Sequence, residues 1–393
     1  MMNKPTDFET ELQRLDRDIR ELEEIARVTA FDSQQATKYA YRLYQRASLT
    51  GNLKELAAAE GAINSAIRQV TSAADLYFLK ASLAFKLHRI ADARRDLSMV
   101  EGLQDSLQGR ALAADLDFQE GRYEEARKEY EAVIRDERTW DNLARLAHLE
   151  AKLGEAERAD ELYVEAEDEI TAKEMRAYAW VELQRGLLDL THGCDEEALV
   201  HYRRAERAYS GYWLVDEHMA ELLGAQGKYD EAVALYQKVV ARVPKPELQQ
   251  ALGELSALMG KSDQAEAWFE RALAAYLESA AHNEVHYYHH LADFYADVRE
   301  DGREAVKWAR MDAELRDNFS TQAALGWALY RNGQFDDALA MLNQALASGV
   351  RDAQIFFHAA EIHRSLGASG ESERYLQMAA EVNPYYRNFH VHH

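Results

Sequence analysis

A short pattern recurs along the chain at a nearly constant interval. It consists of a glycine, an alanine five residues later and an aromatic residue or leucine four residues after that, as in GRYEEARKEY, GKYDEAVALY and GQFDDALAML. The small residue of each copy stands at Ala59, Ala93, Ala126, Ala159, Ala198, Ala232, Ala265, Ala305, Ala338 and Ser372. These positions are 33 or 34 residues apart, except for two intervals of 39 and 40. Such a period predicts an array of stacked repeats.

The residue types within one copy predict a hairpin of two helices. Glycine permits the tight turn between the helices. The small residue lets two helix backbones approach closely, and the aromatic side chain one turn later fills the gap beside it. Only four prolines interrupt the chain, and helix-forming residues dominate it. One hairpin cannot bury its apolar stripe alone, so we expect neighbouring hairpins to stack into a solenoid.

This pattern resembles the tetratricopeptide repeat over residues 37–386, because period, glycine, alanine and aromatic positions agree together. The proline that follows the second helix in this family stands at Pro244 and Pro384, whereas most other units lack it. The resemblance implies an all-α fold: an α-solenoid of about ten helix hairpins wound into a right-handed superhelix. Ten units imply more than one superhelical turn. The concave groove of this family, lined mainly by the first helix of each pair, binds peptides or partner proteins.

The two ends of the chain differ from the repeats. Residues 1–36 hold one amphipathic helix with Leu12, Leu15, Ile19, Leu22 and Ile25 on one face. We expect it to cap the first repeat; self-association through a short coiled coil is the alternative. Residues 387–393 form a short tail with His390, His392 and His393, either frayed or able to bind metal.

Two units are about five residues longer than the others. The additional residues fall in 166–180 and 272–288, between the second helix of one unit and the first helix of the next. Neither stretch contains proline or glycine, and both keep apolar residues at helical spacing, which predicts helices lengthened by about a turn. The lengthening is either neutral drift at the rim or the edge of a binding surface.

The family geometry implies which residues face the groove. It selects Trp180, Leu183, Leu187, His286, His289, Asp293, Trp327, Tyr330, Arg331 and Phe357. The groove would then carry an apolar patch at its middle and a mixture of histidine, aromatic and charged residues further on. Aromatic side chains are suited to anchor a partner. No unit has the lysine and asparagine with which some family members clamp chaperone C-termini, so that activity is not implied.

The stretch HNEVHYYHH at 282–290 permits two interpretations. His286 and His289 together with Asp293 could hold zinc or nickel, since imidazole and carboxylate are common ligands of both. The spacing of a zinc hydrolase is absent, however, and histidine and tyrosine are ordinary amphipathic lining residues of a peptide groove. His290 is expected to point away from the groove, toward neighbouring helices.

Composition argues against several classes of function. A formal net charge of −23 disfavours binding of nucleic acid and of anionic membranes. No apolar run is long enough to cross a membrane, and no signal peptide is evident, so we expect a cytoplasmic protein unless an export signal has been trimmed. The single cysteine, Cys194, lies beside three acidic residues, which raises its pKa and argues against a nucleophile.

These observations favour a non-enzymatic scaffold or adaptor that holds a partner protein or peptide in its groove. No phosphate loop, hydrolase elbow or dinucleotide fingerprint is found, so neither an enzymatic activity nor a cofactor is expected. The alternative is an accessory protein that binds a metal or small ligand through the histidines of the eighth repeat. A regulatory role would require a partner, because no output domain is attached.

Overall fold

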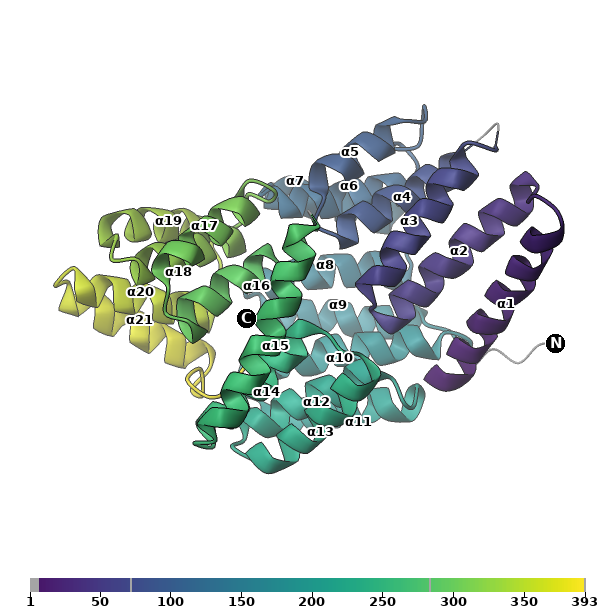
Figure 1. The fold of residues 1–393 in the computed structure, drawn as a ribbon. Helices are drawn as coiled ribbons and strands as arrows, with labels where there is room; N and C mark the ends of the chain where they lie inside the picture. Colours follow the sequence, from purple (N-terminus) through teal and green to yellow (C-terminus); the bar gives the residue numbers. More distant parts are fainter. Residues whose placement is uncertain (1–6, 71–72, 283, 392–393) are drawn as a thin grey trace.

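The computed structural model describes residues 7–391 except 71, 72 and 283, and almost all of this chain is helical (Figure 1). The first half contains α1 (Phe8–Val28), α2 (Ser33–Thr50), α3 (Leu53–Ile67), α4 (Ala74–Lys86), α5 (Ile90–Ser98), α6 (Leu107–Gln119), α7 (Tyr123–Asp136), α8 (Trp140–Leu153), α9 (Ala156–Glu169), α10 (Met175–Thr191) and α11 (Asp195–Ala208). The second half contains α12 (Trp213–Ala225), α13 (Tyr229–Arg242), α14 (Pro246–Leu258), α15 (Ser262–Ala281), α16 (Tyr288–Asp293), the π-helix η1 (Phe294–Val298), α17 (Gly302–Ala313), α18 (Phe319–Arg331), α19 (Phe335–Ala347), α20 (Ala353–Ser365) and α21 (Ser369–Val382). None of the helices in the described part is long and apolar enough to cross a membrane.

After α1, consecutive helices pair into ten hairpins, from α2–α3 to α20–α21, as the repeat pattern predicts. The small residue of each unit lies on the second helix and is buried: eight of the ten are 0% exposed, and Ala265 and Ser372 are 4% and 6% exposed. Tyrosine one turn later is equally buried, as at Tyr163, Tyr202 and Tyr236. The local geometry inferred from the sequence is therefore confirmed.

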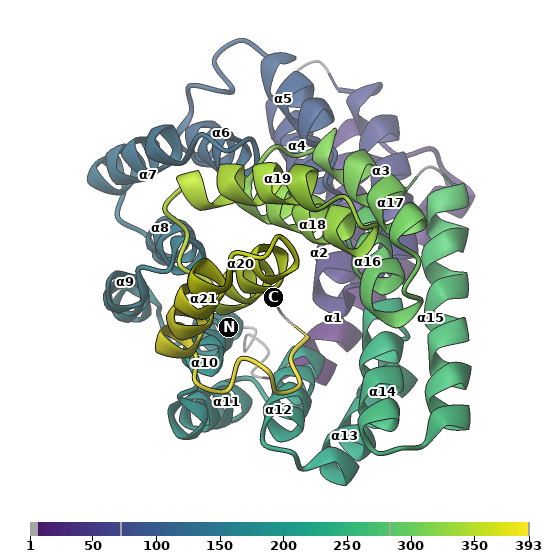
Figure 2. The ribbon, with the colours of Figure 1, turned by 90° about the vertical axis from the view of Figure 1, so that its left-hand side faces the viewer.

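The ten hairpins wind into a superhelix. Viewed along its axis, the first helices α8, α10, α12 and α14 lie on the inside of the ring, and the second helices α9, α11, α13 and α15 lie outside (Figure 2). The turn inside every hairpin contains a residue with positive φ, which is glycine in eight units. The two exceptions are His88 with φ 59° and Glu300 with φ 50°.

The two long units accommodate their additional residues differently. Helix α15 is extended to 20 residues, which confirms the predicted lengthening for 272–281. In the other long unit α9 ends at Glu169 after 14 residues, and the additional length lies in the loop and in the 17-residue α10. The eighth unit also holds one residue more before its turn, and the π-helix η1 absorbs it.

Successive superhelical turns stack directly on each other along a seam, which we define as the contacts between the turn of one hairpin and residues nearly 200 positions later. The Asn318 side chain donates a hydrogen bond to the Gln119 carbonyl at 3.2 Å, 199 residues away. The Arg351 backbone N–H donates to the Leu153 carbonyl at 3.1 Å. With a period near 34 residues, this separation corresponds to about six units per superhelical turn.

The N-terminal helix α1 also belongs to the seam. It packs along α2, where a cap is expected, and buries Leu15, Ile19 and Leu22 there. Across the seam, the Tyr209 hydroxyl donates a hydrogen bond to the Glu11 carboxylate at 2.7 Å. Most of the apolar stripe is thus covered within the chain, which leaves little of it for self-association.

The close approach at the seam yields a first prediction. A β-carbon at Gly154 would lie 2.6 Å from the Arg351 carbonyl oxygen, whereas one at Gly227 meets nothing within 4 Å. Both glycines have positive φ, so alanine at either position introduces about 1–2 kcal/mol of backbone strain. Gly154→Ala must also relieve the clash, which adds roughly 1–3 kcal/mol. We expect urea unfolding to show the larger loss for Gly154→Ala; equal losses would contradict the seam contact.

Candidate functional site

Three residues expected to line the groove gather in one aromatic cluster, which comprises Trp327 and Tyr330 of α18, Phe357 and His358 of α20, and Tyr386. Trp327 lies between Tyr330 and His358, with ring centroids 4.8 and 3.9 Å away and interplanar angles of 19° and 7°. Phe357 lies 5.7 Å from Tyr386, the residue that extends the cluster beyond α21. Tyr330, Phe357, His358 and Tyr386 are partly exposed, so the cluster presents a continuous aromatic surface.

Trp327 is the central ring of this aromatic cluster and its only buried member. Only 8% of it is exposed, and its indole N–H donates to both carboxylate oxygens of Asp297 at 3.0 Å. Arg331, another predicted groove residue, donates from Nε to the Ala296 carbonyl at 2.7 Å and forms an ion pair with Glu300. Trp327 therefore orients its neighbours, and the accessible contacts are offered by Tyr330 and Phe357.

The predicted apolar patch in the middle of the array is only partly accessible. Leu183 is 0% exposed in a core cluster with Tyr202, so its assignment to the groove is wrong. Trp180 and Leu187 are partly exposed, and Trp180 lies 6.4 Å from Trp140 of the preceding unit. The long α10 thus offers two apolar side chains instead of three.

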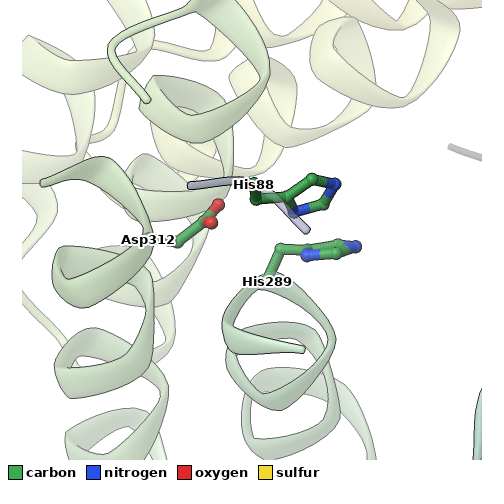
Figure 3. Close-up of side chains that lie close together, drawn as sticks. All are labelled: His88, His289 and Asp312. Atoms are coloured by element: carbon green, nitrogen blue, oxygen red, sulfur yellow. The ribbon is translucent and has the colours of Figure 1, made fainter. Parts of the chain in front are cut away.

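The histidines of the eighth unit meet a partner that the sequence interpretation did not name. His88, from the turn between α4 and α5, lies with its ring 4.7 Å from His286 and 5.3 Å from His289. The predicted set of His286, His289 and Asp293 is not brought together. Among the described residues, the group able to surround one ion is instead His88, His289 and Asp312, whose ligand atoms lie within 4.8 Å of one another (Figure 3).

Burial keeps these imidazoles neutral. It lowers the pKa of His88 and His289 well below the usual range, and nearby Arg316 acts in the same direction. Burial also lowers the pKa of His286 to about 3. His290 stacks on Tyr276 with ring centroids 5.6 Å apart, but its ring also lies 4.0 Å from that of His289, so the expectation that it points away from this group is wrong.

Of the two residues in this group that the sequence interpretation did not name, one could have been found from the sequence and the other could not. HRIADARRDL is a weak copy of the repeat in which His88 occupies the glycine position, and that departure could have singled it out. Asp312 lies on the second helix, α17, where the resemblance gives no reason to expect a ligand.

Acidic side chains crowd the first helices of the seventh and eighth units. Desolvation by the surrounding helices raises the pKa of Asp293 to about 8, and the negative charges of Asp297 and Asp312 raise this pKa further. The residue nevertheless remains exposed to water. Burial likewise raises the pKa of Glu254 to about 7, against the hydrogen bond from Gln250. Such crowding of carboxylates favours an approaching cation.

Basic side chains lie on the first helix of the fourth unit, α8. Burial lowers the pKa of Arg145 to about 10 and that of His148 to about 4, and it also lowers the pKa of Lys152. The inner helices therefore carry basic groups in the fourth unit and acidic groups three to four units later.

Cys194 is the N-cap residue of α11 and is exposed. Partial burial raises its pKa, and the charges of Asp189, Glu197 and Asp195 raise it further. The thiol is thus a poor nucleophile, in agreement with the sequence.

The family model of the tetratricopeptide repeat matches residues 219–280 and 323–386. The first segment runs from within α12 almost to the end of α15, and the second from within α18 past the end of α21; the remaining hairpins repeat the same geometry. These two segments are tetratricopeptide repeats. The ten repeats assigned from the sequence and the ten hairpins of the structure coincide.

Solved structures of similar shape are related only distantly to this repeat protein. Yeast Tom70 shares 14% identity over 94% of this chain and 89% of that chain, with a TM-score of 0.43. The Cut9–Hcn1 hetero-tetramer of the APC/C shares 18% identity over 88% and 74%, also with a TM-score of 0.43. These TM-scores are too low for either structure to support a conclusion about this chain. No curated protein matches the sequence.

The raised pKa of Glu254 gives a second prediction. Its folded pKa of about 7 lies above the ordinary 4.5, so its contribution to stability is complete below pH 4.5 and is lost as the pH rises through 7. Glu254→Gln should therefore be more stable than the wild type near pH 8, on the order of 1 kcal/mol after allowance for screening by water. The advantage should shrink toward about pH 5.5.

Urea unfolding at both pH values measures this difference. Glu131→Gln, at an exposed position of the outer helix α7, is the matched control and should show no such dependence on pH. A constant difference between the Glu254 variant and the wild type would count against the raised pKa.

Proposed function

We propose that this repeat protein is a non-enzymatic scaffold that holds a segment of a partner protein or peptide against its eighth to tenth units. The observation that carries the proposal is the aromatic cluster around Trp327. Its outer rings, Tyr330 and Phe357, are partly exposed on the first helices of adjacent units. Aromatic anchors that are held rigidly and remain accessible are typical of interaction hot spots.

Charge suggests the chemistry of the partner. Burial raises the pKa of Asp293 and of Glu254, and the negative charge of Asp297 raises both further. A lysine or arginine side chain brought among them would relieve this repulsion and form charge-assisted hydrogen bonds. We therefore expect the preferred segment to combine apolar or aromatic residues with basic ones. The formal net charge of −23 would speed its approach.

The third prediction tests the aromatic surface. Tyr330→Ala combined with Phe357→Ala removes two accessible rings and leaves the nearly buried Trp327 in place. Loss of a hot-spot aromatic typically weakens binding by about 2 kcal/mol or more, so partner affinity should fall at least ~30-fold. Affinity capture from the native organism, followed by mass spectrometry and titration of the captured partner, measures this.

Trp268→Ala is the matched control. Trp268 is a partly exposed aromatic residue on the outer helix α15, where it stacks under Arg271. Partners that bind through the aromatic cluster should be retained by this variant and lost by the double variant. If the double variant captures the same proteins with unchanged affinity, binding does not take place at this surface.

A further inference from the structure

Two regions of the chain that are about 200 residues apart in sequence place ligand-type side chains at one point of the seam. His88 comes from the turn between α4 and α5, His289 from α16 and Asp312 from α17 (Figure 3). Each offers one ligand atom, and these atoms lie within 4.8 Å of one another. Figure 3 shows the Asp312 carboxyl directed toward the imidazole rings.

The backbone at His88 is held in a conformation that a β-carbon disfavours. Its φ is 59°, in the left-handed region, and the corresponding turn residues of the next three units are Gly121, Gly154 and Gly193. Glycine makes this turn without strain, so the turn itself gives no reason for histidine. Strain that persists at one position of a repeated turn indicates that the side chain is needed there.

The imidazoles at this point have unused nitrogen atoms. The Nδ1 atoms of His88, His286 and His289 are buried, and none has a hydrogen-bond partner. Buried polar atoms are normally satisfied, so three such nitrogens in one cluster require an explanation. Their lone pairs are the donors that imidazole offers to a transition metal.

Asp312 supplies the anionic ligand. It is 2% exposed, and Arg316 Nη2 donates to its two oxygens at 2.9 and 2.6 Å. A carboxylate can accept up to about four bonds, so this pairing leaves lone pairs directed elsewhere. Arg316 thus fixes the orientation of Asp312 in the way that outer-shell partners hold metal-binding carboxylates.

We propose that His88, His289 and Asp312 form a binding site for a divalent transition metal, with zinc as the best fit, and that His286 is its fourth ligand. Two or three imidazoles with one carboxylate suit zinc. Tetrahedral ligands at zinc are about 3.4 Å apart, so ligand atoms that now lie within 4.8 Å of one another would close by at most about 1.4 Å. Side-chain rotation supplies a movement of this size.

The site would join the two superhelical turns. His88 belongs to the second unit, whereas His289 and Asp312 belong to the eighth, and each neighbouring position of the seam is held by direct hydrogen bonds. A metal that binds these side chains only when the turns are stacked stabilises the stacked form over the unfolded chain. The ion would have a structural role.

Zinc titration of the full-length chain is the fourth prediction. The tail histidines His390, His392 and His393, of which the last two lie outside the described residues, are first replaced by alanine to remove competing imidazoles. After chelator dialysis, calorimetry should show one zinc ion per chain, and zinc should raise the Tm. Cobalt bound in its place should give the visible absorption of a tetrahedral site.

Two variants and one control distinguish this site from adventitious binding. His88→Gly restores the residue that the turn prefers, so the metal-free protein should remain folded while zinc affinity falls more than ~100-fold. Asp312→Asn should have a similar effect on affinity. His282→Ala, an exposed histidine that bonds to the Glu278 carbonyl, should leave affinity unchanged.

Other outcomes would overturn the proposal. They are the absence of saturable zinc binding, or binding that His88→Gly leaves intact. Circular dichroism checks the fold of each variant; if one is unfolded, His289→Asn provides the same test within α16. Loss of zinc binding with retained capture of a protein partner would separate this site from the scaffold function.

Discussion

The contact between successive superhelical turns is the constraint on which this structure depends. The turns of the early hairpins lie against backbone or side chains about six units later, so a turn residue that meets backbone there must be small and must tolerate positive φ. Gly121 and Gly154 meet both demands, since a β-carbon at either would approach a carbonyl oxygen of the next turn within 2.6 Å. The same stacking determines what the inner helices can expose, because each unit is covered both by its sequence neighbours and by the following turn.

The hairpin itself could be predicted from the sequence, whereas the seam could not. Ala198 and Tyr202 are one helical turn apart, so their shared burial leaves a periodic pattern that the chain repeats ten times. Seam contacts join residues nearly 200 positions apart, far beyond the span of one repeat. Asn318, Arg351 and Asn383 recur at about the repeat period and each meets the turn of an earlier hairpin, yet the period does not indicate which later unit an early turn contacts.

The same distinction explains the outcome at the candidate sites. Family geometry gives the face of a helix on which a residue lies, and Tyr330, Phe357 and Trp327 are indeed neighbours in space. It does not give how deeply a residue is buried, so it wrongly places Leu183 in the groove. The second helix of the same unit covers this side chain. It also gives no information on residues contributed by another superhelical turn, so it does not indicate His88, and it selects first-helix residues, so it indicates Asp293 and not Asp312 of the second helix.

In a repeat array, the other units show which residue a given position normally contains, so a different residue at one unit is informative. Ten turns adopt positive φ in this chain, and eight of them use glycine. Glu300, one exception, pairs with Arg331 of the next unit, so its side chain has a partner that accounts for the strain. His88 is the other exception, and its ring faces two further imidazoles with unused nitrogen atoms. Because the other units show what the turn requires by itself, the strain at His88 must be attributed to what its side chain binds.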